Sequence, residues 1–510
     1  MKKITLWLLL SVVCSACQAE DVIVSFKGKK VKVEQKTKDS LNVSVDGACV
    51  SIESLYTNHQ LTLRLTGKSD DGRLVLKTAG KARVKLDALT LTSQEGAPLC
   101  LKNGKKVEIV AVKGTVNTLT IAACKDTANH KAATIWGKGK LLFSGKGTLN
   151  VIANGDGCRG IKSKKDIMIE DLTLNVTTTG DNLGEKPFGF GGFPSFGNDS
   201  IKHGGFPGFG NDSIKRGGFP GFGNDSIRGG GFSGGMPGIG GFPGFGNDSI
   251  KRGAFSGFPA APDSIAEGGF PGFGGKHKYY SAAKGIASKG KVTVNSGILT
   301  VRTSTAGAEG IEGKEGVVFN GGSVDVIATD DAINAGATIE FNGAKVIARS
   351  TTNDAVDSNP KGGFFMPFGQ PASDNDATPA IIIRGGTVYA WSQVGSPEEG
   401  IDCDFSPIVV EGGTIFSVGG GMGEMPSVPT NKTAHQPTVL LIGLDVVKDE
   451  PITILDSSDR LIDTVTIPFS LRRSASLVSS PHFKVGGTYK VKTKGYEKTF
   501  TIKEPFTAVR

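Results

Sequence analysis

The sequence has few of the residues on which most enzyme active sites and metal centres depend. Its six histidines are scattered along 510 residues. The Gly-x-Ser-x-Gly pattern occurs at 231–235 in a Gly/Phe/Pro-rich stretch, not at a predicted strand-to-helix turn, so no elbow for a nucleophilic serine is indicated. The five cysteines after residue 20 show no Cys-x-x-Cys spacing, which argues against a zinc knuckle or a dithiol redox motif. Aromatic residues make up only 7%, whereas glycine contributes 74 residues. This balance favours many short strands and turns over a helical enzyme.

Long apolar runs are also missing after the N-terminus. A membrane helix needs about 20 consecutive apolar residues, and no later segment approaches this length. We therefore expect no transmembrane span. Residues 1–19 join Lys2 and Lys3 to an apolar run and end in small residues at Ala19, as a signal peptide does. Two kinds of processing fit: cleavage after Ala19, or lipidation of Cys17 at a lipobox-like site. The protein is expected to be exported, as a cell-envelope lipoprotein at the surface or in the periplasm, or as a secreted soluble protein.

The remaining cysteines and the net charge say little more about the class of protein. The cysteines after the leader are odd in number, and small core fillers are their expected role: Cys49, Cys100, Cys124, Cys158 and Cys403. The net charge of +9 is modest for this length, and it would suit either solubility or an anionic polymer. No basic arm is present, so nucleic acid is not expected as a partner.

What the chain does have is a recurring strand. Seven segments combine a small or polar turn with strict alternation of apolar and polar residues, which indicates strands. Aligned on the first inward residue, they give the anchors Leu149, Leu174, Leu299, Val324, Val346, Val388 and Ile415. The steps between anchors are 25, 125, 25, 22, 42 and 27 residues. A period of about 25 remains once one insertion is removed from each long step.

This period, without helical segments, predicts an all-β fold: a right-handed single-stranded parallel β-helix, a solenoid whose turns bury their apolar faces on one another. The spacing alone would also admit leucine-rich repeats, but their Leu-x-x-Leu-x-Leu pattern occurs at 86–91 and does not recur in the seven aligned segments. The β-helix domain is expected over residues 20–437, and a small C-terminal β-rich cap over 438–510. Residues 183–282 form a Gly/Phe/Pro-rich insertion with a 13-residue repeat, which is expected to be disordered.

A second motif, rich in acidic residues, recurs between the strands. Stacked strands about 4.8 Å apart would place its equivalent residues in columns. One column contains Arg159, Lys284, Glu309, Asp331, Asp354 and Glu399, and the other contains Lys162, Ala287, Glu312, Asn334, Asp357 and Asp402. Carboxylates about 5 Å apart would repel by roughly 3 kcal/mol per pair at an effective dielectric of about 20. We therefore expect a bound cation, and oxygen ligands without His or Cys favour Ca²⁺. The alternative is that these turn carboxylates point into water.

Outward positions of the aligned strands suggest a second surface. Tyr389, Trp391 and Phe416 would cluster on one face beside Arg349. Sugar rings stack on aromatic faces flanked by polar groups, so we predict a carbohydrate-binding surface there. The alternative is that the cap or an insertion covers these rings.

Candidates for catalysis are few. Arg159, Lys162 and Lys284 lie in the two columns, on repeats that adjoin the acidic ones. A polysaccharide lyase could use calcium to acidify a uronate and one of these residues as the base. The alternative is that they are ordinary solvated turn residues.

These segments resemble a bacterial family of carbohydrate-binding, calcium-binding parallel β-helix proteins with a polysaccharide-lyase-like fold. The resemblance spans about residues 70–489 and rests on APLCLKN from Ala97, GKGTLNV from Gly145, GIKSKKDIMI from Gly160, DAVDSN from Asp354 and EEGIDCD from Glu398. It implies calcium in the acidic turns and binding of polysaccharides, acidic pectic or cellulosic, without established catalysis. This chain has Arg159 and Lys284 where the family motif would have acids, so the N-terminal repeats are expected to lack calcium.

Together, the columns and the resemblance define a set of candidate ligands. The predicted calcium ligands are Asp156, Glu309, Glu312, Asp330, Asp331, Asn334, Asp354, Asp357, Glu398, Glu399, Asp402 and Asp404. The expected function is non-catalytic, calcium-dependent binding of polysaccharide at the cell envelope. Two alternatives stay open: a calcium-dependent, pectate-type lyase, and a structural adhesin whose calcium only stiffens the solenoid.

Overall fold

The computed structural model describes residues 20–36, 41–124, 131–183, 282–360, 378–403, 406–421 and 426–510. They belong to one compact unit, formed by residues 1–186 and 278–510. The predicted leader with Cys17, residues 184–281 of the insertion predicted over 183–282, and Asp404 lie outside the described residues. Every regular element described is a strand, which confirms the all-β prediction. No helix in the described ranges is long and apolar enough to cross a membrane.

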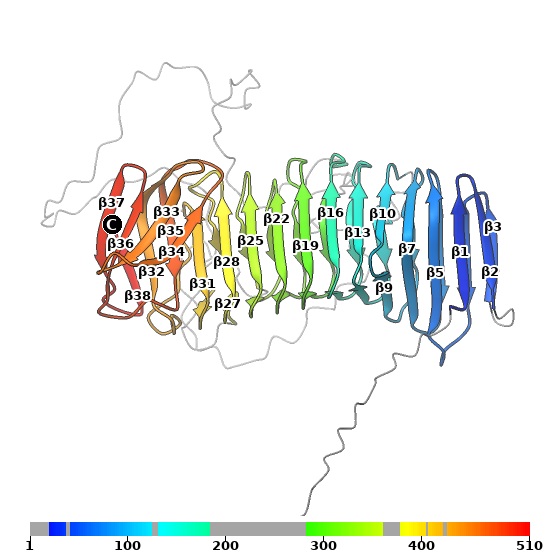
Figure 1. Ribbon diagram of the computed structural model, residues 1–510, viewed down its shortest axis with the longest axis horizontal. Coiled ribbons are helices and arrows are strands. Elements are labelled where there is room, and N and C mark those ends of the chain that lie inside the picture. Colours follow the sequence, from blue (N-terminus) through cyan, green and yellow to red (C-terminus); the bar gives the residue numbers. More distant parts are fainter. Residues whose placement is uncertain are drawn as a thin grey trace, which may run out of the picture. The chain divides into compact units, whose positions relative to one another are not determined.

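Each repeat in the middle of the chain supplies three strands. One repeat consists of β14 (Arg159–Ser163), β15 (Ile167–Ile169) and β16 (Thr173–Thr178). The next described repeat consists of β17 (Lys284–Ser288), β18 (Val292–Val294) and β19 (Ile298–Thr303). Each strand pairs in parallel with its equivalent, β14 with β17, β15 with β18 and β16 with β19. The repeats therefore follow one another strand on strand, as the ordered arrows of Figure 1 show.

The strands form three stacks. The first stack is an 11-stranded sheet of β3 (Leu41–Asp46), β4 (Cys49–Ser54), β6 (Arg73–Thr78), β8 (Leu99–Leu101), β11 (Ala133–Gly137), β14, β17, β20 (Ile311–Gly313), β23 (Ile333–Ala335), β26 (Val356–Ser358) and β29 (Ile401–Asp402). The second stack contains β9 (Val107–Ala111), β12 (Leu141–Gly145), β15, β18, β21 (Val317–Phe319), β24 (Ile339–Phe341), β27 (Ile381–Ile383) and β30 (Ile408–Val410). The third contains β10 (Val116–Ile121), β13 (Thr148–Ala153), β16, β19, β22 (Ser323–Ala328), β25 (Lys345–Ser350), β28 (Thr387–Ser392) and β31 (Thr414–Gly419).

The register of the third stack is the predicted one. Leu149 pairs with Leu174, and the same register continues through every anchor to Ile415. Strict alternation puts each anchor inside, where it is at most 1% exposed, and all of them belong to one buried cluster. Burial of each such side chain contributes about 1.5–3 kcal/mol to folding. The apolar period therefore both sets the register and supplies the core.

Gly145 allows two repeats to approach closely, and this leads to a stability prediction. Gly145 ends β12 with φ at +111°, and an added Cβ would lie 2.1 Å from the carbonyl oxygen of Ala111 on β9. We expect Gly145→Ala to lower the free energy of unfolding by about 2–3 kcal/mol in urea titrations. Gly114→Ala is the matched control, because Gly114 also has a positive φ but has nothing within 4 Å. Equal losses in the two variants would mean that the close approach is unimportant.

Hairpins and antiparallel strands lie at the two ends of the stacks. At the N-terminal end, β1 (Val22–Lys27) pairs antiparallel with β2 (Lys30–Gln35) and parallel with β5 (Leu61–Ser69), and β5 pairs with β7 (Ala82–Ser93). At the other end, β31 pairs antiparallel with β35 (Leu471–Ser479), which pairs with β32 (Thr438–Val446). β38 (Phe506–Val509) pairs in parallel with β32.

The remaining C-terminal strands form a separate four-stranded antiparallel sheet. It contains β33 (Pro451–Asp456), β34 (Leu461–Thr466), β36 (Thr488–Thr493) and β37 (Tyr496–Thr501). A buried apolar cluster joins residues of this sheet to β32 and β35, and it extends to Trp391, Phe416 and Val418 on the last repeats of the third stack. The C-terminal strands thus cover the end of the third stack.

Candidate cation and carbohydrate site

The second predicted residue column is a continuous ladder on the first stack. Lys162 pairs with Ala287, then Glu312, Asn334, Asp357 and Asp402 follow in register. Their apolar neighbours in sequence, such as Ile311 and Ile333, are fully buried inside the stack. The ladder therefore runs along the outer face, and the spacing between its members is that of neighbouring strands, about 4.8 Å.

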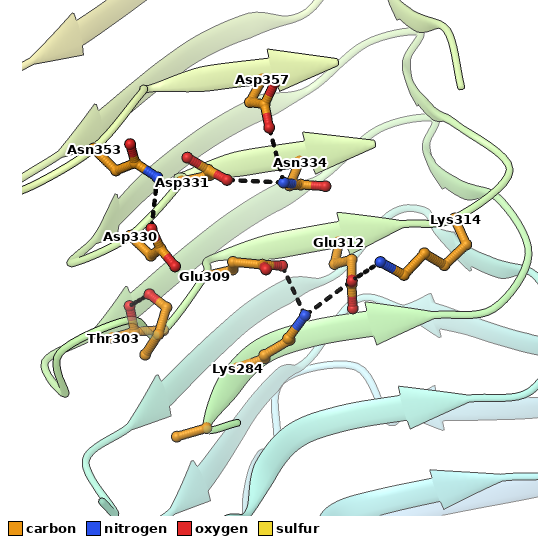
Figure 2. Close-up of polar contacts among 12 residues, drawn as sticks. Lys284, Thr303, Glu309, Glu312, Lys314, Asp330, Asp331, Asn334, Asn353 and Asp357 are labelled. Atoms are coloured by element: carbon orange, nitrogen blue, oxygen red, sulfur yellow. Dashed lines mark hydrogen bonds and ion pairs between the residues drawn. The ribbon is translucent and has the colours of Figure 1, made fainter. Parts of the chain in front are cut away.

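At one end of the acidic stretch, lysine ammonium groups pair with two of the predicted ligands. Lys284 Nζ lies 3.0 Å from Glu309 Oε2 and 2.9 Å from Glu312 Oε1, and Lys314 Nζ lies 2.5 Å from the same Glu312 oxygen (Figure 2). Burial opposes the ionisation of Glu312, but Lys284 and Lys314 outweigh it and lower the pKa of Glu312 to about 2. Protein cations therefore occupy the positions around Glu309 and Glu312 where a metal ion was predicted.

Lys284 is itself poorly suited to act as a base. Burial disfavours its charge, but the carboxylates of Glu309 and Glu312 outweigh burial and raise its pKa. Its side chain is only 11% exposed. An ammonium held in this way has no lone pair with which to abstract a proton.

The next repeats bring several carboxylates together. Asn334 donates through Nδ2 to Asp331 Oδ2 at 2.8 Å and to Asp357 Oδ2 at 3.1 Å, and Asn353 donates to Asp330 Oδ1 at 2.7 Å (Figure 2). The other oxygen of Asp331, Oδ1, is buried and accepts no hydrogen bond. Burial raises the pKa of Asp331 well above its usual range, and the carboxylates of Asp357 and Asp330 raise it further. A bound cation would reduce the repulsion among these carboxylates.

A further group of acids lies on the last repeats of the first stack. Asp354 accepts a hydrogen bond from the backbone N–H of Glu399, yet burial and the neighbouring Asp402 raise the pKa of Asp354 well above its usual range. Ser427 donates its N–H to Glu399 Oε2 at 2.6 Å and its hydroxyl to Asp402 Oδ1 at 2.9 Å. Burial and Asp402 also raise the pKa of Glu398. Protein donors thus satisfy Glu399 and Asp402 better than Asp331.

Not all predicted ligands come together. Asp156 follows β13, three repeats before Asp330, where it is exposed and accepts a hydrogen bond from Asp181 N–H at 3.0 Å. Asp404 lies outside the described residues. In the described part of the chain, no group of three or more His, Cys, Asp or Glu side chains is arranged to hold one metal ion. The residues that the structure brings closest to such an arrangement are Asp330, Asp331, Asn334, Asp354 and Asp357.

Three polar residues of this face were not predicted from the sequence. Lys314 pairs with Glu312, Ser427 donates to Glu399 and Asp402, and Asn359 donates to both oxygens of Asp357 at 3.0 and 2.8 Å. Lys314 and Asn359 each follow an acid of the ladder by two residues, the distance that returns a strand to the same face. This two-residue spacing is the sequence signal that could have placed Lys314 and Asn359 on the same face as the ladder.

The predicted aromatic surface requires a correction. Trp391 is 5% exposed and Phe416 is 1% exposed, because β32, β35 and the C-terminal sheet pack over them. Trp391 donates its indole N–H to the carbonyl oxygen of Phe416 at 3.2 Å, and its ring stacks on Tyr389 with the centroids 5.7 Å apart. Neither Trp391 nor Phe416 presents a face to a sugar. Tyr389 and Arg349 are half-buried beside them.

The outer face of the third stack stays accessible farther from the C-terminal strands. It carries half-buried polar side chains in register, and Asn175 donates to Asn150 Oδ1 at 2.9 Å. On β19, the strand that pairs with β16, Arg302 Nη2 lies 2.5 Å from Asp325 Oδ2 of the following strand. Arg349 lies two strands beyond Arg302 in the same register, with only Ile327 between them. The amide and guanidinium groups of this row can hydrogen-bond to sugar hydroxyls, and its apolar groups can contact the faces of sugar rings.

Comparisons with known proteins find similarity to proteins described as carbohydrate-binding and as polysaccharide lyase-like. A family model described as "Carbohydrate-binding domain-containing protein" matches residues 46–186 and 261–355. A carbohydrate-binding domain-containing protein of Acetivibrio thermocellus is 28% identical over 151 residues, which are 28% of this chain and 50% of that protein. The match thus spans half the length of that relative. The polysaccharide lyase-like protein from C. thermocellum, solved as a gadolinium derivative, aligns with a TM-score of 0.37 and 17% identity, covering 64% of this chain and 90% of that chain.

Proposed function

We propose that this protein binds polysaccharide in a calcium-dependent manner at the bacterial cell envelope and has no catalytic activity of its own. The observation that carries the proposal is the cluster around Asp331, a buried carboxylate with a raised pKa and one buried oxygen that accepts no hydrogen bond. The match to the carbohydrate-binding family model, whose second segment includes Glu309, Asp331 and Asp354, supports a saccharide as the ligand. The proposed location rests on the leader predicted in residues 1–19.

The donor chemistry of this face fits calcium. Carboxylate and amide oxygens are hard ligands, and no His or Cys side chain is among the residues that converge. The residues that would hold the ion are Asp330, Asp331, Asn334, Asp354 and Asp357. Bound calcium would neutralise these carboxylates and offer its remaining coordination positions to oxygens of an acidic sugar.

The proposed glycan is an acidic pectic or cellulosic chain, and the surface that would hold it runs along the repeats. The three stacks of mostly parallel strands support the more detailed proposal of a right-handed, single-stranded parallel β-helix, whose outer face offers an extended binding site. On the third stack, Asn150, Asn175, Arg302 and Arg349 would contact sugar hydroxyls.

The protonated state of Lys284 favours binding over catalysis. A lyase needs a base that is neutral when the substrate arrives. Lys284 pairs with two carboxylates that raise its pKa, so it is a poor candidate for that base.

A retention experiment tests the proposal. The purified protein is passed over immobilised polygalacturonate and over cellulose, with calcium and then with EGTA, and the ultraviolet absorbance of the flow-through is followed. We expect retention that EGTA reduces at least about 10-fold, and no rise in absorbance from unsaturated sugars. Arg302→Gln combined with Arg349→Gln should weaken retention without changing calcium affinity.

Two outcomes would overturn the proposal. Calcium-dependent release of unsaturated sugars would make the protein a lyase. Binding of calcium without retention of any glycan would leave the adhesin alternative, in which calcium only stiffens the repeats.

A further inference from the structure

Two cysteines lie at equivalent ends of neighbouring repeats. β10 and β13 pair in parallel up to Ile121 and Ala153, and Cys124 and Cys158 follow within a few residues of these strand ends. Backbone hydrogen bonds keep the two chains together beyond the strands, because Asn154 N–H donates to the carbonyl oxygen of Ile121 at 3.0 Å. The pairing of the strands therefore carries both cysteines to the same corner.

Gly155 lies between the two segments that carry these cysteines. A Cβ added at Gly155 would lie 3.0 Å from Ala123 Cα and 3.0 Å from Cys158 Sγ, so the residue before Cys124 and the sulfur of Cys158 both lie against this glycine. The turn is closed by Cys158 N–H, which donates to the carbonyl oxygen of Gly155 at 3.1 Å. Cys158 is fully buried among Ile121, Ala132 and Ala153, and the half-buried Cys124 packs against this group.

Cys124 packs against the buried group that contains Cys158. The neighbouring Cys124 thiol and burial raise the pKa of Cys158. The Cys158 thiol also donates to the carbonyl oxygen of Asp156 at 3.6 Å. Both cysteines are reduced in the structure, as are the other cysteines of the described residues. Cys49 and Cys100 lie on β4 and β8 of the first stack and provide matched controls.

We propose that Cys124 and Cys158 form a disulfide when the protein meets an oxidising compartment, and that this bond fastens two neighbouring repeats together. The oxidant is a disulfide donor, either a small molecule or a protein. The thiolate of the more exposed Cys124 attacks the donor disulfide, forms a mixed disulfide and releases one donor thiol. Cys158 then loses its proton, attacks the sulfur of Cys124 and releases the second donor thiol. The two cysteine protons end on the two donor thiols, so atoms and electrons balance.

Such a bond suits the predicted export of the chain, since disulfides persist outside the reducing cytosol. It would close the segment from 124 to 158, which includes all of β11, β12 and β13. A closed loop of this length restricts the unfolded chain, and the folded repeats would gain stability.

Peptide mapping tests the bond directly. The full chain is incubated with oxidised glutathione, denatured, alkylated with N-ethylmaleimide and digested with trypsin. The two cysteines fall in different tryptic peptides, residues 114–125 and 147–159. We expect these two peptides to be joined, with the loss of two hydrogens, and to separate on reduction. Two results overturn the proposal. Either both peptides are recovered separately with alkylated cysteines, or each is joined to a peptide that contains another cysteine.

Thermal unfolding provides a second measurement. The oxidised protein should melt roughly 3–8 °C above the reduced protein. Cys124→Ser, at the half-exposed position, should abolish this difference, and Cys158→Ser should do the same if it folds. Cys100→Ser should keep the difference. If Cys124→Ser also keeps it, another pair of thiols is responsible and the proposal fails.

Discussion

Replacing Asp331 and Asp354 together by asparagine is expected to stabilise the calcium-free protein and to remove most of its calcium affinity. Burial and neighbouring carboxylates raise the pKa of both groups well above the usual range. Asparagine keeps an oxygen acceptor but has no charge to bury and no proton to gain. We expect the free energy of unfolding without calcium to rise by about 1–3 kcal/mol. Calcium affinity should fall at least about 100-fold, because it follows the number of charged ligands.

The pH dependence of the calcium-free protein provides an independent readout. A carboxyl group whose pKa is higher in the folded chain than in the unfolded chain binds its proton more tightly when folded. Its contribution to stability is therefore lost as pH rises from about 4, the unfolded value, through the raised folded value. We expect the wild-type protein in EGTA to be more stable at pH 5 than at pH 7. The double variant should lack the part of this gain that protonation of Asp331 and Asp354 supplies.

A matched control separates this effect from the general loss of a carboxylate. Asp166 is also partly buried, but Lys140 at 2.7 Å outweighs burial and lowers the pKa of Asp166. Asp166→Asn should therefore destabilise the protein slightly, the opposite of the double variant. Urea unfolding in EGTA and calorimetric titration with calcium measure both quantities. If the double variant loses stability as Asp166→Asn does, the buried acids are not in conflict and the calcium proposal loses its basis.

The sequence predicted the register of the repeats in detail because that register depends on local rules. Alternation fixes which side chain points inward, and pairing then brings Leu149, Leu174 and Leu299 into line. The same rule placed Glu312, Asn334 and Asp357 on one outer ladder. The proximity of Cys124 and Cys158 was within reach of this reasoning as well, since both follow paired strand ends.

Contacts between distant segments and the directions of long side chains were not predictable in this way. Trp391 and Phe416 point outward from their strands as expected, but β32 and β35, which lie later in the chain, pack over them. Alternation along one strand carries no information about a segment that folds over it. In the same way, the position of Lys284 followed from the repeat, but its reach along the stack to Glu309 did not.

That reach of Lys284 leads to the largest expected change in stability. Lys284→Met should lower the free energy of unfolding by about 3–5 kcal/mol, because it leaves Glu309 and Glu312 buried without their shared ammonium. The side chains of Glu309 and Glu312 are only 17% and 7% exposed, so water cannot replace Lys284. Methionine keeps much of the length and apolar stem of lysine, so the loss reports on the charge more than on packing.

Lys314→Met is the matched control for charge in the same cluster. Lys314 lies 2.5 Å from Glu312, but its side chain is 56% exposed, so water and salt can take its place. We expect a loss of about 0–1 kcal/mol for this variant. Adding Glu309→Gln to Lys284→Met should recover a substantial part of the loss, because it removes the unpaired buried charge. Equal losses for the two lysine variants, or no recovery in the double variant, would mean that the lysine acts through packing. Recovery would instead show that Lys284 acts through its charge, by neutralising the buried carboxylates of Glu309 and Glu312.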